Sequence, residues 1–197
     1  VALCLAGMDL YDAVVHSFAT ISTGGFSTRN ASIAAFGSPA ITWIVAIFMF
    51  LSGINFSLIF ISLRGHIREA LHSEELRVYT AVVVGMTLLI CLCLRLQAGI
   101  PLSGSITDAA FQTVTIITTT GYATADFNVW PGLSRAILFA LMFIGGCAGS
   151  TAGGLKVSRA MILLRTIRRE INRLVHPRRV TAVRCDGFAV GAAPLPC

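Results

Sequence analysis

The sequence predicts an all-α membrane protein in which a short re-entrant helix, a glycine-centred bend and an apolar inner helix occur twice. The chain of 197 residues is 55% apolar but only 12% charged, whereas soluble domains carry roughly 25% charged residues. Several apolar stretches approach the roughly 20 residues that a helix needs to cross a bilayer. Because a hydroxyl-rich bend follows a short helical pattern at two places, we expect non-helical backbone inside the membrane at both.

The basic residues predict how the chain is oriented in the membrane. The net charge is +6, and the positive-inside rule assigns basic clusters to the cytoplasm. One cluster contains Arg64, Arg68 and Arg77, and a larger one lies near the C-terminus: Lys156, Arg159, Arg165, Arg168, Arg169, Arg173, Arg178, Arg179 and Arg184. We therefore expect a multi-pass protein of the inner (plasma) membrane. A nucleic-acid surface is the alternative for the second cluster, but such arginines are ordinary for membrane topology, so we expect no nucleic-acid partner.

The first half of the chain is expected to begin inside a longer protein. Residues 1–7 are typical of the end of a membrane helix, and the chain does not start with Met. Residues 9–21 have an apolar face at helical spacing but are too few to span a bilayer. We predict a re-entrant helix here, with Asp9 or Asp12 as its cap.

The segments that follow alternate between breaks and apolar helices. The two glycines in residues 22–30 predict non-helical backbone, and the uncharged residues 40–63 predict one spanning helix. The remaining expectations are a polar connector at 67–76, a span at 78–94, an outer loop at 97–105, a second re-entrant helix at 108–117 capped by Thr107 or Asp108, a basic helix at 155–174 ended by Pro177, and no clear element at 180–197.

An internal repeat joins the two bends. Between residues 9–30 and the residues 96 positions later six pairs are identical, and Phe26 aligns with Tyr122; the identical pairs are Asp12/Asp108, Ala13/Ala109, Ile21/Ile117, Thr23/Thr119, Gly25/Gly121 and Thr28/Thr124. After a slip of three residues, the segment 49–53 aligns with 142–146. Self-similarity of this kind indicates one structural unit used more than once.

The two bends carry the residue types that suit a dehydrated cation. Glycine permits the backbone to turn carbonyl oxygens inward, hydroxyl groups add further oxygens, and the C-terminal end of each short helix adds partial negative charge. We predict a selectivity filter for potassium, which is the only metal expected, formed by Ser22, Thr23, Gly24, Gly25, Phe26, Thr119, Thr120, Gly121 and Tyr122. The alternative is that each bend is a plain extracellular loop.

The second inner helix is expected to break in the middle of the membrane. Each glycine destabilises a helix by about 1 kcal/mol relative to alanine, and five occur between 145 and 154. We predict an intramembrane gate loop beneath the bends, formed by Gly145, Gly146, Gly149, Ser150, Thr151, Gly153, Gly154 and Lys156. The alternative is a set of small residues for close helix packing. The segment is not a phosphate-binding loop, because Leu155 separates the last glycine from Lys156.

Three other polar residues could lie on or near the ion path, but each has a simpler interpretation. His16 lies on the first short helix, where a packed or water-facing histidine is the more common case. Asp126 could collect cations at the outer mouth, but an exposed loop aspartate is the default. Lys156 could influence the path by its charge, or it could simply be the first cytoplasmic basic residue. The six cysteines show no metal-ligand spacing, and we expect no covalently bound cofactor and no catalytic residues.

Four segments resemble the Trk/Ktr/HKT superfamily of potassium transporters, and most closely its bacterial TrkH/TrkG potassium uptake subunits. They are HSFATISTGGFSTRNASI (16–33), FLSGINFSL (50–58), TTTGYAT (118–124) and IGGCAGSTAGGLKVSR (144–159). The resemblance implies four units of outer helix, re-entrant pore helix, filter loop and inner helix around one pore, of which this chain holds two. It also implies a homodimer and a cytoplasmic nucleotide-binding regulatory subunit that acts on the gate loop.

The resemblance divides the chain into four parts. Residues 1–66 correspond to the second pore unit without most of its outer helix, 67–77 to a cytoplasmic connector, 78–176 to the third unit with its broken inner helix, and 177–197 to a truncated cytoplasmic tail. The third and fourth units are the alternative assignment. We expect potassium uptake, and not an enzyme; a non-transporting scaffold and an intramembrane enzyme are the rival functions.

Overall fold

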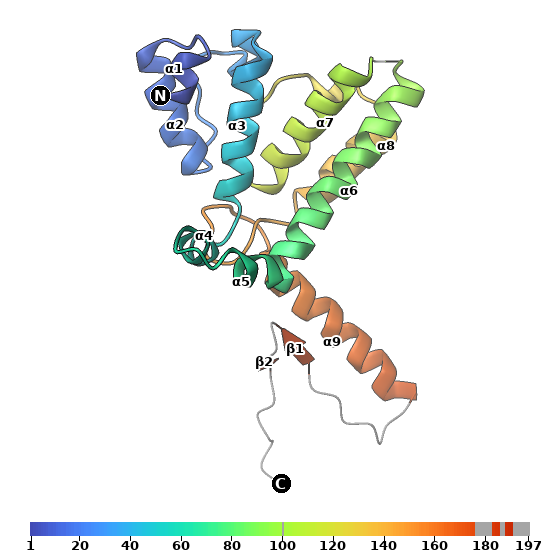
Figure 1. Ribbon diagram of the computed structural model, residues 1–197. Coiled ribbons are helices and arrows are strands. Elements are labelled where there is room, and N and C mark those ends of the chain that lie inside the picture. Colours follow the sequence, from blue (N-terminus) through green and yellow to red (C-terminus); the bar gives the residue numbers. More distant parts are fainter. Residues whose placement is uncertain (100, 176–182, 186–187, 191–197) are drawn as a thin grey trace.

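The computed structural model describes residues 1–99, 101–175, 183–185 and 188–190. Most of the described chain is helical (Figure 1), and its helices are α1 (Ala2–Leu5), α2 (Leu10–Ile21), α3 (Pro39–Ser52), α4 (Phe56–Leu63), α5 (Ile67–His72), α6 (Glu74–Gln97), α7 (Leu102–Ile117), α8 (Gly132–Leu141) and α9 (Val157–Val175). Two short 3₁₀ turns, η1 (Ser32–Phe36) and η2 (Phe127–Val129), follow the two bends. The helix predicted at 9–21 is present as α2, and its re-entrant character stays a prediction.

Helix α7 lies at the centre of the packed helices. It contacts α3 on one side and α6 and α8 on the other, and Figure 1 shows these helices side by side above α4 and α5, which run across their lower ends. The side chains of Phe111 and Ile117 on α7 are fully buried, as are those of Ile90 and Leu94 on α6. Burial of this apolar surface stabilises the packing of α7 against α6.

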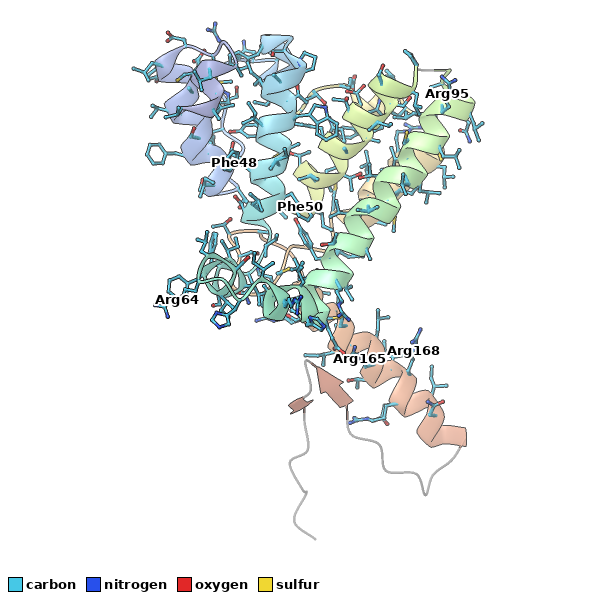
Figure 2. The ribbon with its side chains drawn as sticks, viewed as in Figure 1. Phe48, Phe50, Arg64, Arg95, Arg165 and Arg168 are labelled. Carbon is cyan, nitrogen blue, oxygen red and sulfur yellow. The ribbon has the colours of Figure 1, made fainter. Side chains whose placement is uncertain are left out.

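Helix α6 is the one described helix that is by itself long and apolar enough to cross a membrane. The helix predicted at 78–94 is therefore present with the length and hydropathy of a span, and it extends at both ends to Glu74 and Gln97. Arg95 lies at one end of α6, whereas Arg64, Arg165 and Arg168 lie toward the opposite end of the molecule (Figure 2). This separation agrees with the orientation that the basic clusters predict.

The prediction of one continuous helix at 40–63 is wrong. The apolar stretch divides into α3 and α4, whose axes differ by 102°. The chain turns at Gly53, where a side chain would overlap the Tyr79 hydroxyl, and the Asn55 side chain caps α4 by accepting a bond of 2.8 Å from the Ser57 amide. The slipped repeat already aligned Gly53 with Gly146, so the sequence contained a signal for this break.

Several predicted boundaries also need correction. Helix α7 begins at Leu102, after Pro101 at the N-cap position, so most of the outer loop predicted at 97–105 is helical. Thr107 is not its cap, because its hydroxyl donates to the carbonyl of Ser103 within the helix. Asp9 occupies the N-cap position of α2 but accepts no capping bond.

The segments expected in the cytoplasm contain more regular structure than the sequence suggested. The connector at 67–76 holds α5 and the first turn of α6. The basic helix predicted at 155–174 is α9, and Pro177 lies outside the described residues. Where no element was expected after 180, strands β1 (Val183–Cys185) and β2 (Phe188–Val190) form an antiparallel pair.

Candidate functional site

Helices α2 and α7 end in the same way. After α2 the amide of Gly24 donates to the Ala19 carbonyl at 2.8 Å, and the amide of Thr23 donates to the Thr20 carbonyl at 3.1 Å. After α7 the residues 96 positions later repeat this pattern: Thr120 donates to Thr115 at 2.9 Å and Thr119 to Ile116 at 2.9 Å. Each pair of bonds forms a Schellman motif, which satisfies the last carbonyls of a helix.

The residue in the left-handed position of each motif is a threonine. Thr23 has φ +51° and Thr119 has φ +55°, in a region where a β-branched residue is a genuine outlier and glycine is usual. Two residues later Gly25 and Gly121 also have positive φ, at +67° and +87°. Strained positions of this kind cluster at functional sites, so both bends are candidates for a binding role.

The two bends contact each other although 96 residues separate them. A side chain at Gly25 would overlap the backbone carbonyl of Thr120, so the second bend lies directly against the first. Tyr122, only 1% exposed, donates from its hydroxyl to the Phe26 carbonyl at 3.3 Å. Its counterpart Phe26 is 78% exposed, so the aligned aromatic residues have different surroundings.

His16, on α2, is hydrogen-bonded to the first bend. Its ring is fully buried, with Nε2 2.9 Å from the Ser27 hydroxyl and Nδ1 2.7 Å from the Asp12 carbonyl. The packed alternative for this histidine therefore agrees with its position. Asp12 also stabilises the first bend, because its carboxylate accepts a hydrogen bond from Thr28 at 2.7 Å and pairs with Arg29 at 3.0 Å.

The backbone between α8 and α9 is non-helical, as the glycines predicted. Its two ends lie side by side, because the Gly145 amide donates to the Leu155 carbonyl at 2.8 Å and the Val157 amide donates to the Gly146 carbonyl at 3.2 Å. A side chain at Gly145 would overlap the carbonyl of Gly153. The glycines therefore serve both alternatives: they break the helix and allow close packing, here of the loop on itself.

This loop lies directly against both bends. The Thr23 hydroxyl donates to the Thr151 carbonyl at 3.0 Å, and the Gly153 amide donates to the Thr119 hydroxyl at 2.7 Å. The Thr151 hydroxyl bonds the Ile21 carbonyl at the end of α2 at 3.0 Å. The two strained threonines therefore connect the bends to the loop, a role that the sequence alone did not predict.

The loop also completes the break between α3 and α4. The Cys147 amide donates to the Gly53 carbonyl at 2.8 Å, and the Phe56 amide donates to the Gly149 carbonyl at 3.1 Å. Backbone groups away from water need such partners, because each unsatisfied one costs several kcal/mol in a bilayer. The two breaks satisfy each other, which explains how both are tolerated.

Two charged side chains hold the loop. Lys156 donates from Nζ to the carbonyls of Ala152 and Ser150. Glu75, which is only 5% exposed, accepts from the amide of Ala148 at 2.6 Å and from that of Ser158, in the first turn of α9, at 3.2 Å. Sequence reasoning missed Glu75; its signal was an acidic residue at the start of an otherwise apolar span.

The predicted site residues thus come together from distant parts of the chain. Backbone oxygens and hydroxyls of the two bends adjoin a polar loop, and no cluster of His, Cys, Asp or Glu able to hold a metal occurs among the described residues. Oxygen without fixed charge is the ligand set that replaces the hydration shell of an alkali cation.

A family model described as a cation transport protein, TrkH, matches residues 5–193. The chain belongs to the TrkH family. The "Trk system potassium uptake protein TrkH" of Escherichia coli K12 is 43% identical over 193 residues, which are 96% of this chain and 40% of that protein. The TrkG protein of the same organism is 35% identical over 94% of this chain and 39% of its own length. The family is one of transporters, so the prediction that the chain is not an enzyme is confirmed at this level.

A solved structure gives the same result for the TrkH fold. The crystal structure of the potassium transporter TrkH from Vibrio parahaemolyticus matches with a TM-score of 0.91 and 40% sequence identity, covering 96% of this chain and 41% of that one. The chain therefore spans about two fifths of the length of these relatives. The membrane location and the mainly helical fold predicted from the sequence agree with this comparison.

Proposed function

We propose that this chain forms part of a potassium uptake protein with a channel-like pore, in which the two bends are walls of a selectivity filter and the loop at 145–154 is a gate. One observation carries the proposal: two bends with the same strained backbone lie against each other and are both hydrogen-bonded to the loop. The names of the relatives, which are potassium uptake proteins, support the choice of ion.

The filter coordinates potassium through backbone carbonyls and hydroxyls of residues 22–26 and 119–122. Each bend has one glycine matched between the repeats, Gly25 and Gly121, rather than the TVGYG run of potassium channels. The carbonyls are consequently less strictly ordered, and the filter discriminates against sodium less strongly than those channels do.

The contacts of the loop at 145–154 with the bends and with Glu75 suggest how it could act as a gate. The loop contacts Thr23 and Thr119 of the two bends, and Glu75 links it to α9, which supports a gate role for the loop. A pull on α9 from the cytoplasm changes the position of the Ser158 amide and, through Glu75, that of Ala148. A cytoplasmic nucleotide-binding regulatory subunit is the partner that this arrangement suits. In this proposal the complete protein holds four pore units, assembles as a homodimer and crosses the inner membrane several times.

The test is potassium uptake by the full-length protein in cells without other uptake systems, comparing wild type with Gly121→Ser. Because φ of +87° is unfavourable for serine, we expect reduced uptake or entry of sodium. Unchanged uptake with unchanged preference for potassium over sodium would show that the bend is a scaffold loop and not a filter. Bi-ionic flux through the wild type tests the weaker discrimination against sodium: exclusion as strong as in potassium channels contradicts it.

A further inference from the structure

A recess with several hydroxyl groups in its lining lies beside the second bend, between the start of α3 and the first turns of α7. Its volume is about 420 Å³. Hydroxyl groups and one carboxylate gather there, from three segments of the chain: Ser38, Thr42, Ser103, Thr107, Asp108 and Thr124. Helix α7 reaches the recess at its end away from the gate loop, which is the outer end in the orientation given above.

The carboxylate of Asp108 differs from its counterpart in the first half. Asp12, 96 residues earlier, is 5% exposed and is neutralised by Arg29 at 3.0 Å. The residue aligned with Arg29 in the second half is Ala125, and no ion pair to Asp108 forms among the described residues. The same acidic position is thus compensated in one half and uncompensated in the other.

The oxygens around Asp108 are available as ligands. The Thr124 hydroxyl lies beside the carboxylate and is buried but makes no hydrogen bond of normal geometry. The hydroxyls of Thr42 and Thr107 donate their protons to helix carbonyls, at 3.2 and 3.0 Å, which leaves their lone pairs free to accept. A carboxylate with neutral hydroxyl oxygens is a ligand set for a hard monovalent cation.

We infer that this recess is an outer binding site for an alkali cation, in which Asp108 and Thr124 hold the ion before it enters the filter. The inference rests on the proposed function, since the cation is the one that is transported. An uncompensated charge at a pore mouth raises the local concentration of counter-ions. The site therefore increases the apparent affinity of uptake and leaves the maximal rate to the filter and gate.

The test compares the concentration dependence of rubidium uptake by the full-length protein and its variants. Asp108→Asn removes the charge, while Ala125→Arg supplies the cation that Arg29 supplies to Asp12. Each is expected to raise KM about fivefold at low ionic strength, as loss of one close charge interaction in water predicts, with little change in maximal rate. The control is Asp9→Asn, which removes an exposed carboxylate at the N-cap position of α2 that accepts no capping bond.

Three outcomes decide the inference. A raised KM in both variants but not in the control, with no further rise in the double variant, supports it, because both changes then act on one carboxylate. An unchanged KM in Asp108→Asn, or an equal rise in the control, overturns it. Absence of uptake by the wild type would instead contradict the proposed function.

A second measurement does not depend on transport or on the folding of a variant. Crystals of the full-length protein in thallium(I) should show an anomalous peak between Asp108 and Thr124. A filter occupied by thallium beside a recess without a peak would contradict the site.

Discussion

The two halves of the chain end their short helices in the same way but place the resulting bends in different surroundings. Thr23 and Thr119 have the same left-handed backbone, and equivalent hydrogen bonds close both motifs. Yet Gly25 is packed against the Thr120 carbonyl, whereas a side chain at Gly121 would have nothing within 4 Å. The local sequence therefore determines the backbone of each bend, whereas the segments packed against a bend determine which substitutions it tolerates.

The inner helices show a similar contrast. The first break is short and lies at Gly53; the Asn55 side chain caps it locally, and backbone bonds with the second break complete it. The second extends from the end of α8 at Leu141 to the start of α9 at Val157 and depends on distant groups, above all Glu75. A break that distant side chains hold can be released by moving them, which suits a gate better than a break capped from within.

The largest expected effect separates the two glycines of the proposed filter, Gly25 and Gly121. Gly25→Ala introduces a methyl group that overlaps the Thr120 carbonyl, and such overpacking costs about 1–3 kcal/mol or more beyond the left-handed strain. Gly121→Ala adds only that strain, about 1–2 kcal/mol. We expect Gly25→Ala to abolish uptake and to lower the thermal unfolding midpoint of the purified protein well below that of Gly121→Ala. Equal losses would mean that the bends are not packed as described.

A smaller effect is expected from loosening the second break. Glu75→Gln removes the buried charge that accepts from Ala148 and Ser158, and hydrogen bonds to charged groups contribute about 1.5–3 kcal/mol each at most. We expect a raised potassium flux through the full-length protein in the absence of the proposed regulatory subunit, measured by rubidium efflux from vesicles. The matched control is Glu74→Gln, which removes a partly exposed pair with Arg165 and should change stability by under about 1 kcal/mol. A flux no greater than that of the control would remove Glu75 from the gate.

The smallest effect distinguishes the two strained threonines. Thr119→Val takes the acceptor from the Gly153 amide, while Thr23→Val takes a donor from the Thr151 carbonyl; valine keeps the β-branched shape in both. An unpaired amide is less well tolerated than an under-satisfied carbonyl, so Thr119→Val should free the loop more, by about 1 kcal/mol. Hydrogen exchange of the backbone amides at residues 150–154 of the purified protein measures how far the loop is freed. Faster exchange in Thr23→Val than in Thr119→Val would contradict this order of effects.

Much of the fold was accessible from the sequence because its signals are local. Apolar length predicted α6, the short amphipathic pattern predicted α2, and clustered glycines predicted the loop before α9. The break at Gly53 was missed because one glycine in an apolar stretch is a weak signal by itself. It becomes decisive only when Tyr79, from α6, closes the space that a side chain would need.

The sequence by itself determined most of the helices, where the two bends lie and which family the chain resembles, because hydropathy, glycine and hydroxyl content are properties of neighbouring residues. Only the tertiary structure decided that the bends touch, that Thr23 and Thr119 hold the loop, and that Asp12 is neutralised while Asp108 is not. These facts depend on contacts between residues many positions apart. In a bilayer, where no water completes unpaired backbone groups, such contacts decide which broken helix is stable.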